Sequence, residues 1–145
     1  MTLYLDLACP QCAVLWSRIQ ELELRICARH FPVASKRPRA EALHLAAEAA
    51  ARQSELGFWL LWESLLGDRG RQDDPRIWEL VAEAGLDLDR FEADRRDPAV
   101  AERVKSDLRS GIRAGVAGTP AAFAGGAQLW GDLLESLQFR LSREI

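Results

Sequence analysis

Cys9 and Cys12, near the start of the sequence, are the residues whose type and spacing could do chemistry. A C-x-x-C pair can exchange disulfides, and it can also supply two ligands to a metal site. Cys9 ends an alternating segment and opens a helical one, and the free N–H groups at a helix start stabilise an anion. We therefore predict that Cys9 is partly ionised and attacks a substrate sulfur, and that Cys12, one helical turn further on, resolves the mixed disulfide. Pro10 and Gln11, which separate the cysteines, are expected to contact the substrate.

The segments around this pair predict a βαβ unit. Residues 2–7 alternate in the manner of a strand, with the leucines on one face. Residues 13–21 keep helical spacing, and Pro10 is acceptable in the first turn of a helix. Residues 22–33 alternate again, which predicts a second strand. Two strands joined by one helix should lie parallel, with a right-handed crossover.

Almost every segment from residue 37 to about residue 114 predicts helix, with about five helices in all. Asp-Pro pairs at residues 74–75 and 97–98 mark two of the helix starts. Residues 121–130 predict a hairpin around a Gly-Gly turn, and Asp132 opens a last helix.

This order of elements predicts one α/β domain over residues 1–145. Two parallel strands and an antiparallel hairpin would form a mixed four-stranded sheet with helices on both faces. The helical insertion, over about residues 37–114, would interrupt this sheet.

Several short motifs occur in a specific order along the chain. They are CPQC at residues 9–12, ARHFPV at 28–33, AAEAAARQ at 46–53, FW at 58–59, GLDLDRF at 85–91 and GVAGTPAAF at 115–123. Together they resemble the DsbA-like branch of the thioredoxin superfamily over nearly the whole chain. The resemblance implies a thioredoxin-like sheet with a helical insertion, and the activity of a thiol–disulfide oxidoreductase.

In that family the proline of the Gly-Thr-Pro motif is cis and lies against the cysteine pair, and the residue before it offers its backbone to an extended substrate. Carried over to this sequence, Pro120 would be cis, and Thr119 and Pro120 would bind the substrate. The family commonly continues with larger strand-forming residues and an Asn-Gly turn, whereas this chain has Ala121, Ala122 and a Gly-Gly turn. This departure concerns the substrate and the compartment rather than the fold.

Composition narrows the class of partner. A formal net charge of -3 gives no general attraction for nucleic acid, and no apolar stretch reaches the length of a membrane span. The sequence shows no secretory signal, so we expect a cytoplasmic location. The expected partners are a protein or peptide thiol or disulfide and a reductase, an oxidase or glutathione, with no cofactor and no metal ion. The Pro-Gln spacer resembles that of oxidising members, although a cytosolic glutathione pool would keep a strong oxidant reduced.

Other reactive or polar residues are interpreted as ordinary parts of the fold. Cys27 alternates with apolar neighbours and is expected to be an inert core thiol. Asp6 is expected to face water, although it could relay protons to Cys12. His30 and His44 are expected to be partly buried or surface groups rather than ligands or bases.

Two other classes of function use the same cysteines. Cys9 and Cys12, with Cys27 or His30, could hold zinc or copper in a sensing module, but only two ligands have suitable spacing. A related possibility is a redox-regulated domain that acts on a partner. The remaining alternative is a glutathione-dependent isomerase or transferase, although such relatives usually replace the first cysteine by serine.

Overall fold

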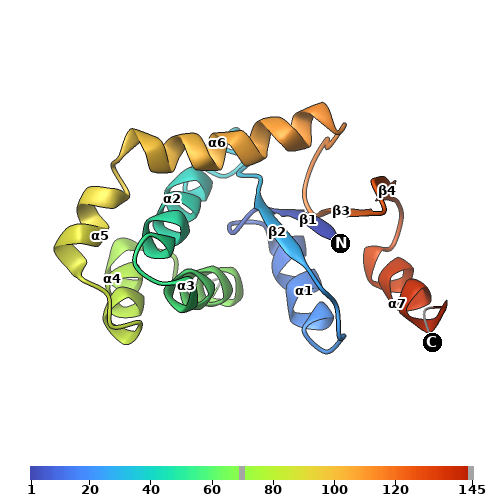
Figure 1. Cartoon of the computed structure of the whole chain (residues 1–145), viewed down its shortest axis with the longest axis horizontal. Coiled ribbons are helices and arrows are strands. Elements are labelled where there is room, and N and C mark those ends of the chain that lie inside the picture. Colours follow the sequence, from blue (N-terminus) through green and yellow to red (C-terminus); the bar gives the residue numbers. More distant parts are fainter. Residues whose placement is uncertain (69–70, 144–145) are drawn as a thin grey trace.

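The computed structural model describes residues 1–68 and 71–143 and contains a four-stranded sheet in the order β2-β1-β3-β4 (Figure 1). β1 pairs in parallel with β2 and antiparallel with β3, and β3 and β4 form a hairpin. The predicted α/β class with a mixed sheet is confirmed. The strands are β1 (Thr2–Leu5), β2 (Cys27–His30), β3 (Ala121–Ala124) and β4 (Ala127–Leu129).

Helix α1 (Pro10–Ile19) joins β1 to β2, and helix α7 (Leu133–Arg143) follows the hairpin. The helical insertion lies between β2 and β3, as predicted. Helix α4 (Asp74–Glu83) of this insertion is capped by Asp73, one residue before the Asp-Pro pair. None of the helices in the described residues is long and apolar enough to cross a membrane. The helices of the insertion are α2 (Ala40–Ala51), α3 (Glu55–Gly67), α4 (Asp74–Glu83), α5 (Leu88–Asp94) and α6 (Pro98–Arg113).

Both faces of β1 are covered, because its side chains alternate between two apolar clusters. Leu3 and Leu5 are fully buried in the cluster that includes side chains of α1 and α7, whereas Tyr4 belongs to the other cluster and its hydroxyl bonds to Ser110 of α6. α1 and α7 lie on one side of the sheet and α6 on the other (Figure 1). A Cβ atom on Gly111 of α6 would lie only 2.7 Å from the ring of Phe31. Glycine destabilises the interior of a helix, so its presence at this position needs a reason. The reason is the close approach of α6 to the sheet, which leaves no room for a Cβ atom.

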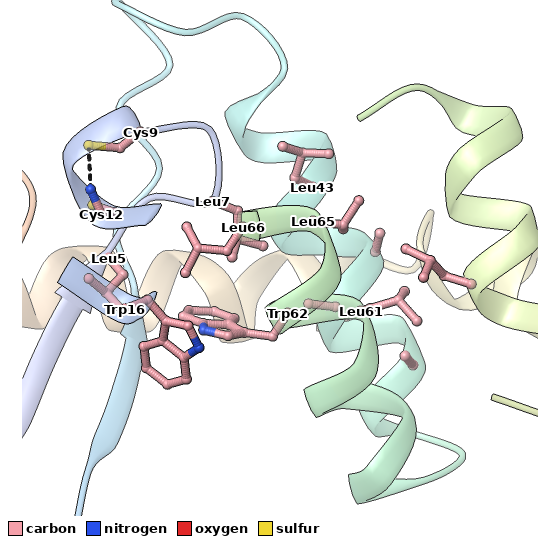
Figure 2. Packing of buried hydrophobic residues seen from close by; sticks show 14 of the residues in the cluster. Leu5, Leu7, Cys9, Cys12, Trp16, Leu43, Leu61, Trp62, Leu65 and Leu66 are labelled. Carbon is pink, nitrogen blue, oxygen red and sulfur yellow. Dashed lines mark hydrogen bonds between the residues drawn. The ribbon is translucent and has the colours of Figure 1, made fainter. Parts of the chain in front are cut away.

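The larger apolar cluster joins the helical insertion to α1 (Figure 2). Trp62 of α3 meets Trp16 of α1 edge to face, with ring centroids 6.4 Å apart. Leu61, Leu65 and Leu66 of α3 are fully buried in the same cluster. Burying each such leucine stabilises the fold by about 1.5–3 kcal/mol. The helix that contains Cys12 and is capped by Cys9 is therefore packed against the insertion.

The second strand is shorter than predicted, and Cys27 lies differently. Pairing with β1 begins at Cys27, opposite Thr2, so residues 22–26 alternate in burial without forming a strand. Cys27 is exposed, and the prediction of a core thiol is wrong. The reason is the position of β2 at the edge of the sheet, where alternate side chains can face solvent.

Candidate active site

Cys9 occupies the end of the short turn between β1 and α1. It is the N-cap residue of α1, with φ -86° and ψ 123°, and its Sγ accepts the backbone N–H of Cys12 at 3.4 Å (Figure 2). Pro10 stands in the first helical turn, where a backbone N–H is not needed for the helix. The structure thus places the Cys9 sulfur where N–H groups of a helix converge, as the sequence predicts.

The surroundings of the two sulfurs favour opposite protonation states. A hydrogen bond from the Cys12 thiol, with a further one from the Cys12 N–H and the charge of Arg37, lowers the pKa of Cys9 to about 5 against the opposing effect of burial. Burial, and then the neighbouring Cys9 sulfur, raise the pKa of Cys12 above its ordinary value. Both side chains are fully buried. One ionised and one protonated sulfur is the pairing that a nucleophile and a resolving thiol require.

Thr119 and Gln11 both approach the Cys9 sulfur. The carbonyl oxygen of Thr119 lies 3.8 Å from Cys9 Sγ, and Oε1 of Gln11 lies 3.5 Å from it. The Thr119–Pro120 peptide bond is cis. The structure therefore brings the Gly-Thr-Pro loop before β3 and the start of α1 together around one sulfur.

A groove of about 680 Å³ lies beside the cysteines, between α1, the Pro120 loop and the start of α7. Most of its side chains are apolar, and the charged ones are Arg18 and Asp132. Three of the predicted substrate-binding residues, Pro10, Gln11 and Pro120, line this groove. The sequence patterns gave no indication that the start of α7 also lines it. The lining residues are Pro10, Gln11, Val14, Leu15, Arg18, Pro120, Gly131, Asp132, Leu133 and Leu134.

Asp6 is fully buried, so the prediction that it faces water is wrong. Its carboxylate accepts the N–H groups of Ala8 at 2.8 Å and Val33 at 3.0 Å, and it pairs with Arg37 at 3.1 Å. Burial raises the pKa of this carboxyl, whereas the hydrogen bonds from the Val33 and Ala8 N–H groups lower it, and the pKa lies below its ordinary value. The loop after β2 folds over the carboxylate, which no local pattern around the C-x-x-C motif could indicate.

The two histidines are buried more deeply than predicted, and they contact each other. His30 and His44 have exposed fractions of 2% and 0%, and their Nδ1 atoms are 2.7 Å apart. Within residues 1–68 and 71–143, no three or more His, Cys, Asp or Glu side chains come together in a way that could hold a metal ion. The third cysteine lies apart on the edge strand. The metal-sensing alternative therefore gains no further ligand from the tertiary structure.

The mixed sheet, the helical insertion and the cysteine pair at the start of α1 define a DsbA-like thiol–disulfide oxidoreductase fold. The family described as the DSBA-like thioredoxin domain matches residues 30–141, and the chain belongs to this family. The solved structure of the thiol-disulfide exchange protein alpha-DsbA2 from Wolbachia pipientis is similar, with a TM-score of 0.84 and 20% identity over 99% of this chain and 80% of that chain. A thioredoxin-like oxidoreductase from Silicibacter pomeroyi DSS-3 has a TM-score of 0.76 and 23% identity over 99% of this chain and 85% of that chain.

A curated relative belongs to a different class of protein. A Na(+)/H(+) antiporter NhaA of Herminiimonas arsenicoxydans is 34% identical to this chain over 135 residues. The match covers 89% of this chain and 21% of the antiporter, so the chain spans about a fifth of the length of that relative.

Proposed function

We propose that this chain is a thiol–disulfide oxidoreductase in which Cys9 is the nucleophile and Cys12 the resolving cysteine. The observation that carries the proposal is the N-cap position of Cys9, where its sulfur accepts the Cys12 N–H and its pKa is lowered to about 5. Thiolate is the attacking species in disulfide exchange. Membership of the DSBA-like thioredoxin domain family supports the same class of reaction.

The exchange consists of two displacements. The Cys9 thiolate attacks one sulfur of a substrate disulfide, the substrate S–S bond breaks, and one substrate thiolate leaves. Cys12 then gives up its proton and attacks the Cys9 sulfur, which forms the Cys9–Cys12 disulfide and releases the second substrate thiolate. Two electrons pass to the substrate, and its two sulfurs take up the Cys12 proton and one proton from solvent. Each step is reversible, so the disulfide form oxidises a substrate dithiol by the same path.

The residues around Cys9 support a protein or peptide substrate. Pro10, Gln11 and Pro120 line the groove, and the Thr119 carbonyl lies close to the Cys9 sulfur. An extended peptide could lay apolar side chains in this groove and pair its backbone with Thr119 while its sulfur meets Cys9. The proposed substrate-binding residues are therefore Pro10, Gln11, Thr119 and Pro120.

The direction of exchange follows from the energetics of Cys9 and from the compartment. A strongly stabilised thiolate favours the dithiol form, and a disulfide whose reduced form is stabilised is a strong oxidant. In the cytoplasmic location expected from the sequence, a reductase or glutathione would keep the pair reduced, and the chain would act through its dithiol. In an oxidising compartment an oxidase would recharge the disulfide, and the chain would oxidise its substrate.

Replacement of each cysteine tests the proposal. Cys9→Ser should abolish the exchange of a model disulfide, whereas Cys12→Ser should accumulate a mixed disulfide with substrate that is visible by mass spectrometry. Cys27→Ser is the matched control, because this third cysteine is exposed and lies on the edge strand. Normal exchange by the Cys9 variant would contradict the proposed mechanism.

The similarity to part of an antiporter favours a second, narrower role, in which the chain is a redox module that acts on a membrane transporter. The Cys12→Ser variant separates this role from general exchange. Expressed in cells, it should trap a disulfide-linked transporter in the membrane fraction if the narrower role holds. Recovery of a wide range of water-soluble proteins in mixed disulfides, with no transporter among them, would support the general role and contradict the narrower one.

A further inference from the structure

The turn that carries Cys9 is held by two side chains from the helical insertion. The backbone N–H of Leu7 donates to Nε2 of His44 at 3.0 Å, and the backbone carbonyl of Leu7 accepts from Nε2 of Gln72 at 2.8 Å. His44 belongs to α2, and Gln72 lies in the segment before α4. Both polar groups of one residue, two positions before the nucleophile, are thus bonded to the insertion. We call His44 and Gln72 the Leu7 clamp.

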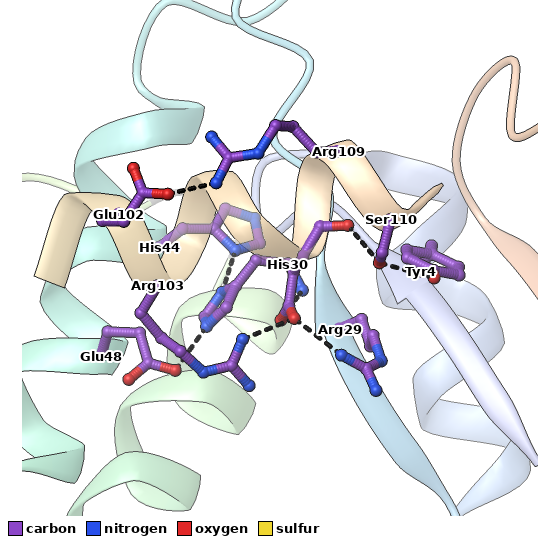
Figure 3. A network of polar contacts seen from close by, with 10 residues as sticks. Tyr4, Arg29, His30, His44, Glu48, Glu102, Arg103, Arg109 and Ser110 are labelled. Carbon is purple, nitrogen blue, oxygen red and sulfur yellow. Dashed lines mark hydrogen bonds and ion pairs between the residues drawn. The ribbon is translucent and has the colours of Figure 1, made fainter. Parts of the chain in front are cut away.

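The acceptor role of His44 depends on a chain of hydrogen bonds that ends at Glu48 (Figure 3). Nε2 of His44 accepts the Leu7 N–H, so the proton of this neutral ring lies on Nδ1. That proton is donated to Nδ1 of His30 at 2.7 Å, and His30 in turn donates its Nε2–H to Oε1 of Glu48 at 2.8 Å. Burial lowers the pKa of His44 to about 4, which keeps the ring neutral near neutral pH.

The second member of the clamp is also fixed. Nε2 of Gln72 donates its other hydrogen to the carbonyl oxygen of Leu65 at 2.8 Å, so its amide is oriented by α3. Within the turn, the N–H of Cys9 donates to the backbone oxygen of Asp6, the residue before Leu7, at 3.0 Å. A displacement of Leu7 would therefore carry Cys9 with it.

We propose that His44 and Gln72 are positioning residues for disulfide exchange. By holding the peptide groups of Leu7, they keep the Cys9 sulfur in place to accept the hydrogen bond from the Cys12 N–H. The expected effect on disulfide turnover rests on the proposed function, whereas the expected effect on the ionisation of Cys9 does not. Neither side chain takes part in the two displacements. Their effect reaches the reaction through the orientation of the turn.

The test compares variants in a Cys27→Ser background, with the ultraviolet absorbance of the thiolate measured against pH. Loss of the clamp should lengthen the N–H···S hydrogen bond to Cys9 and raise the midpoint by about one pH unit in His44→Leu and in Gln72→Leu. The equilibrium with glutathione should then shift about tenfold toward the disulfide form. His44→Gln should restore the wild-type midpoint, because a glutamine amide oxygen can accept the Leu7 N–H.

Leu80→Ala is the control for general loss of stability, because Leu80 is fully buried in α4 and makes no bond to the turn. It should lower the unfolding temperature without moving the thiolate midpoint. Gln72→Leu covers the case in which His44→Leu does not fold, since Gln72 is only half-buried. Wild-type midpoints in every folded clamp variant would overturn the positioning role.

The outcome is separable from the fate of the proposed function. If the clamp variants shift the midpoint but the wild-type chain turns over no disulfide, the clamp stands and the oxidoreductase proposal fails. If the wild-type chain is active and the midpoints do not move, the oxidoreductase proposal stands and the clamp fails.

Discussion

The reaction of Cys9 with iodoacetamide should show a pH profile unlike that of an ordinary cysteine. Only the thiolate is alkylated, so the rate follows the ionised fraction. The pKa of Cys9 is lowered to about 5, chiefly by the hydrogen bond from the Cys12 thiol. The rate constant should therefore rise to a plateau with its midpoint near this value, whereas free cysteine has its midpoint at about 8.5.

The size of the effect depends on the pH at which it is measured. At pH 7 Cys9 is almost fully ionised and free cysteine about 3%, an advantage of about 30-fold. A pKa lower by about 3.5 units makes a thiolate less nucleophilic by about 40-fold, so the two factors nearly cancel at neutral pH. At pH 5 the ionised fractions differ by about 1,600-fold, which leaves Cys9 about 40-fold faster than free cysteine.

The assay is the pseudo-first-order alkylation of the reduced Cys27→Ser chain, followed by mass spectrometry from below the expected midpoint to above that of free cysteine. Cys9 is fully buried, and limited access would lower the plateau without moving the midpoint. The same chain with Cys9→Ser should show no low-pH phase, because the pKa of Cys12 is raised by burial. A midpoint close to that of free cysteine would refute the argument that hydrogen bonds from the thiol and the N–H of Cys12 ionise Cys9.

Three further predictions concern stability. Gly111→Ala should destabilise the chain by about 1–3 kcal/mol in urea unfolding, because its Cβ would lie 2.7 Å from Phe31; a gain in stability would show that α6 can move away from the sheet. Asp107→Ala should lower the free energy of unfolding by about 2–3 kcal/mol, because Oδ2 of Asp107 accepts the buried backbone N–H of His30 at 3.1 Å and the variant leaves that N–H without its acceptor. An unchanged urea midpoint would contradict this prediction. Acid should also destabilise the fold: burial lowers the pKa of His44 from 6.5 to about 4, so the unfolded chain binds a proton that the folded chain does not bind within this interval. The free energy of unfolding should fall by about 3 kcal/mol as the pH drops through this interval. In a Cys9→Ser background, His44→Gln should remove this pH dependence relative to the chain that keeps His44.

Local patterns were sufficient for the type and order of the elements and for the centre of the site. The alternation of β1, the helical spacing after Cys12 and the Gly-Gly turn each depend on neighbours within a few residues. The position of Cys9 at the start of α1 follows from two such patterns that meet at one residue. The Gly-Thr-Pro motif was assigned to the site through a family resemblance, and the structure places Thr119 close to the Cys9 sulfur.

Burial and long-range polar contacts could not be read from the sequence. The same alternation that predicted β2 continues through residues 22–26, but a strand also needs a partner, and the register with β1 starts only at Cys27. That residue is exposed because β2 is an edge strand, which depends on the order of the whole sheet.

The sequence by itself determined the class of fold, the order of its elements and the cysteine pair, because each depends on residue types at short spacing. Only the tertiary structure decided that Asp6 is buried under the loop after β2 and that His44 and Gln72 bond to Leu7. The physical reason is that a buried polar group must find its partner wherever the folded chain supplies one, and here the partners come from segments far apart in the sequence.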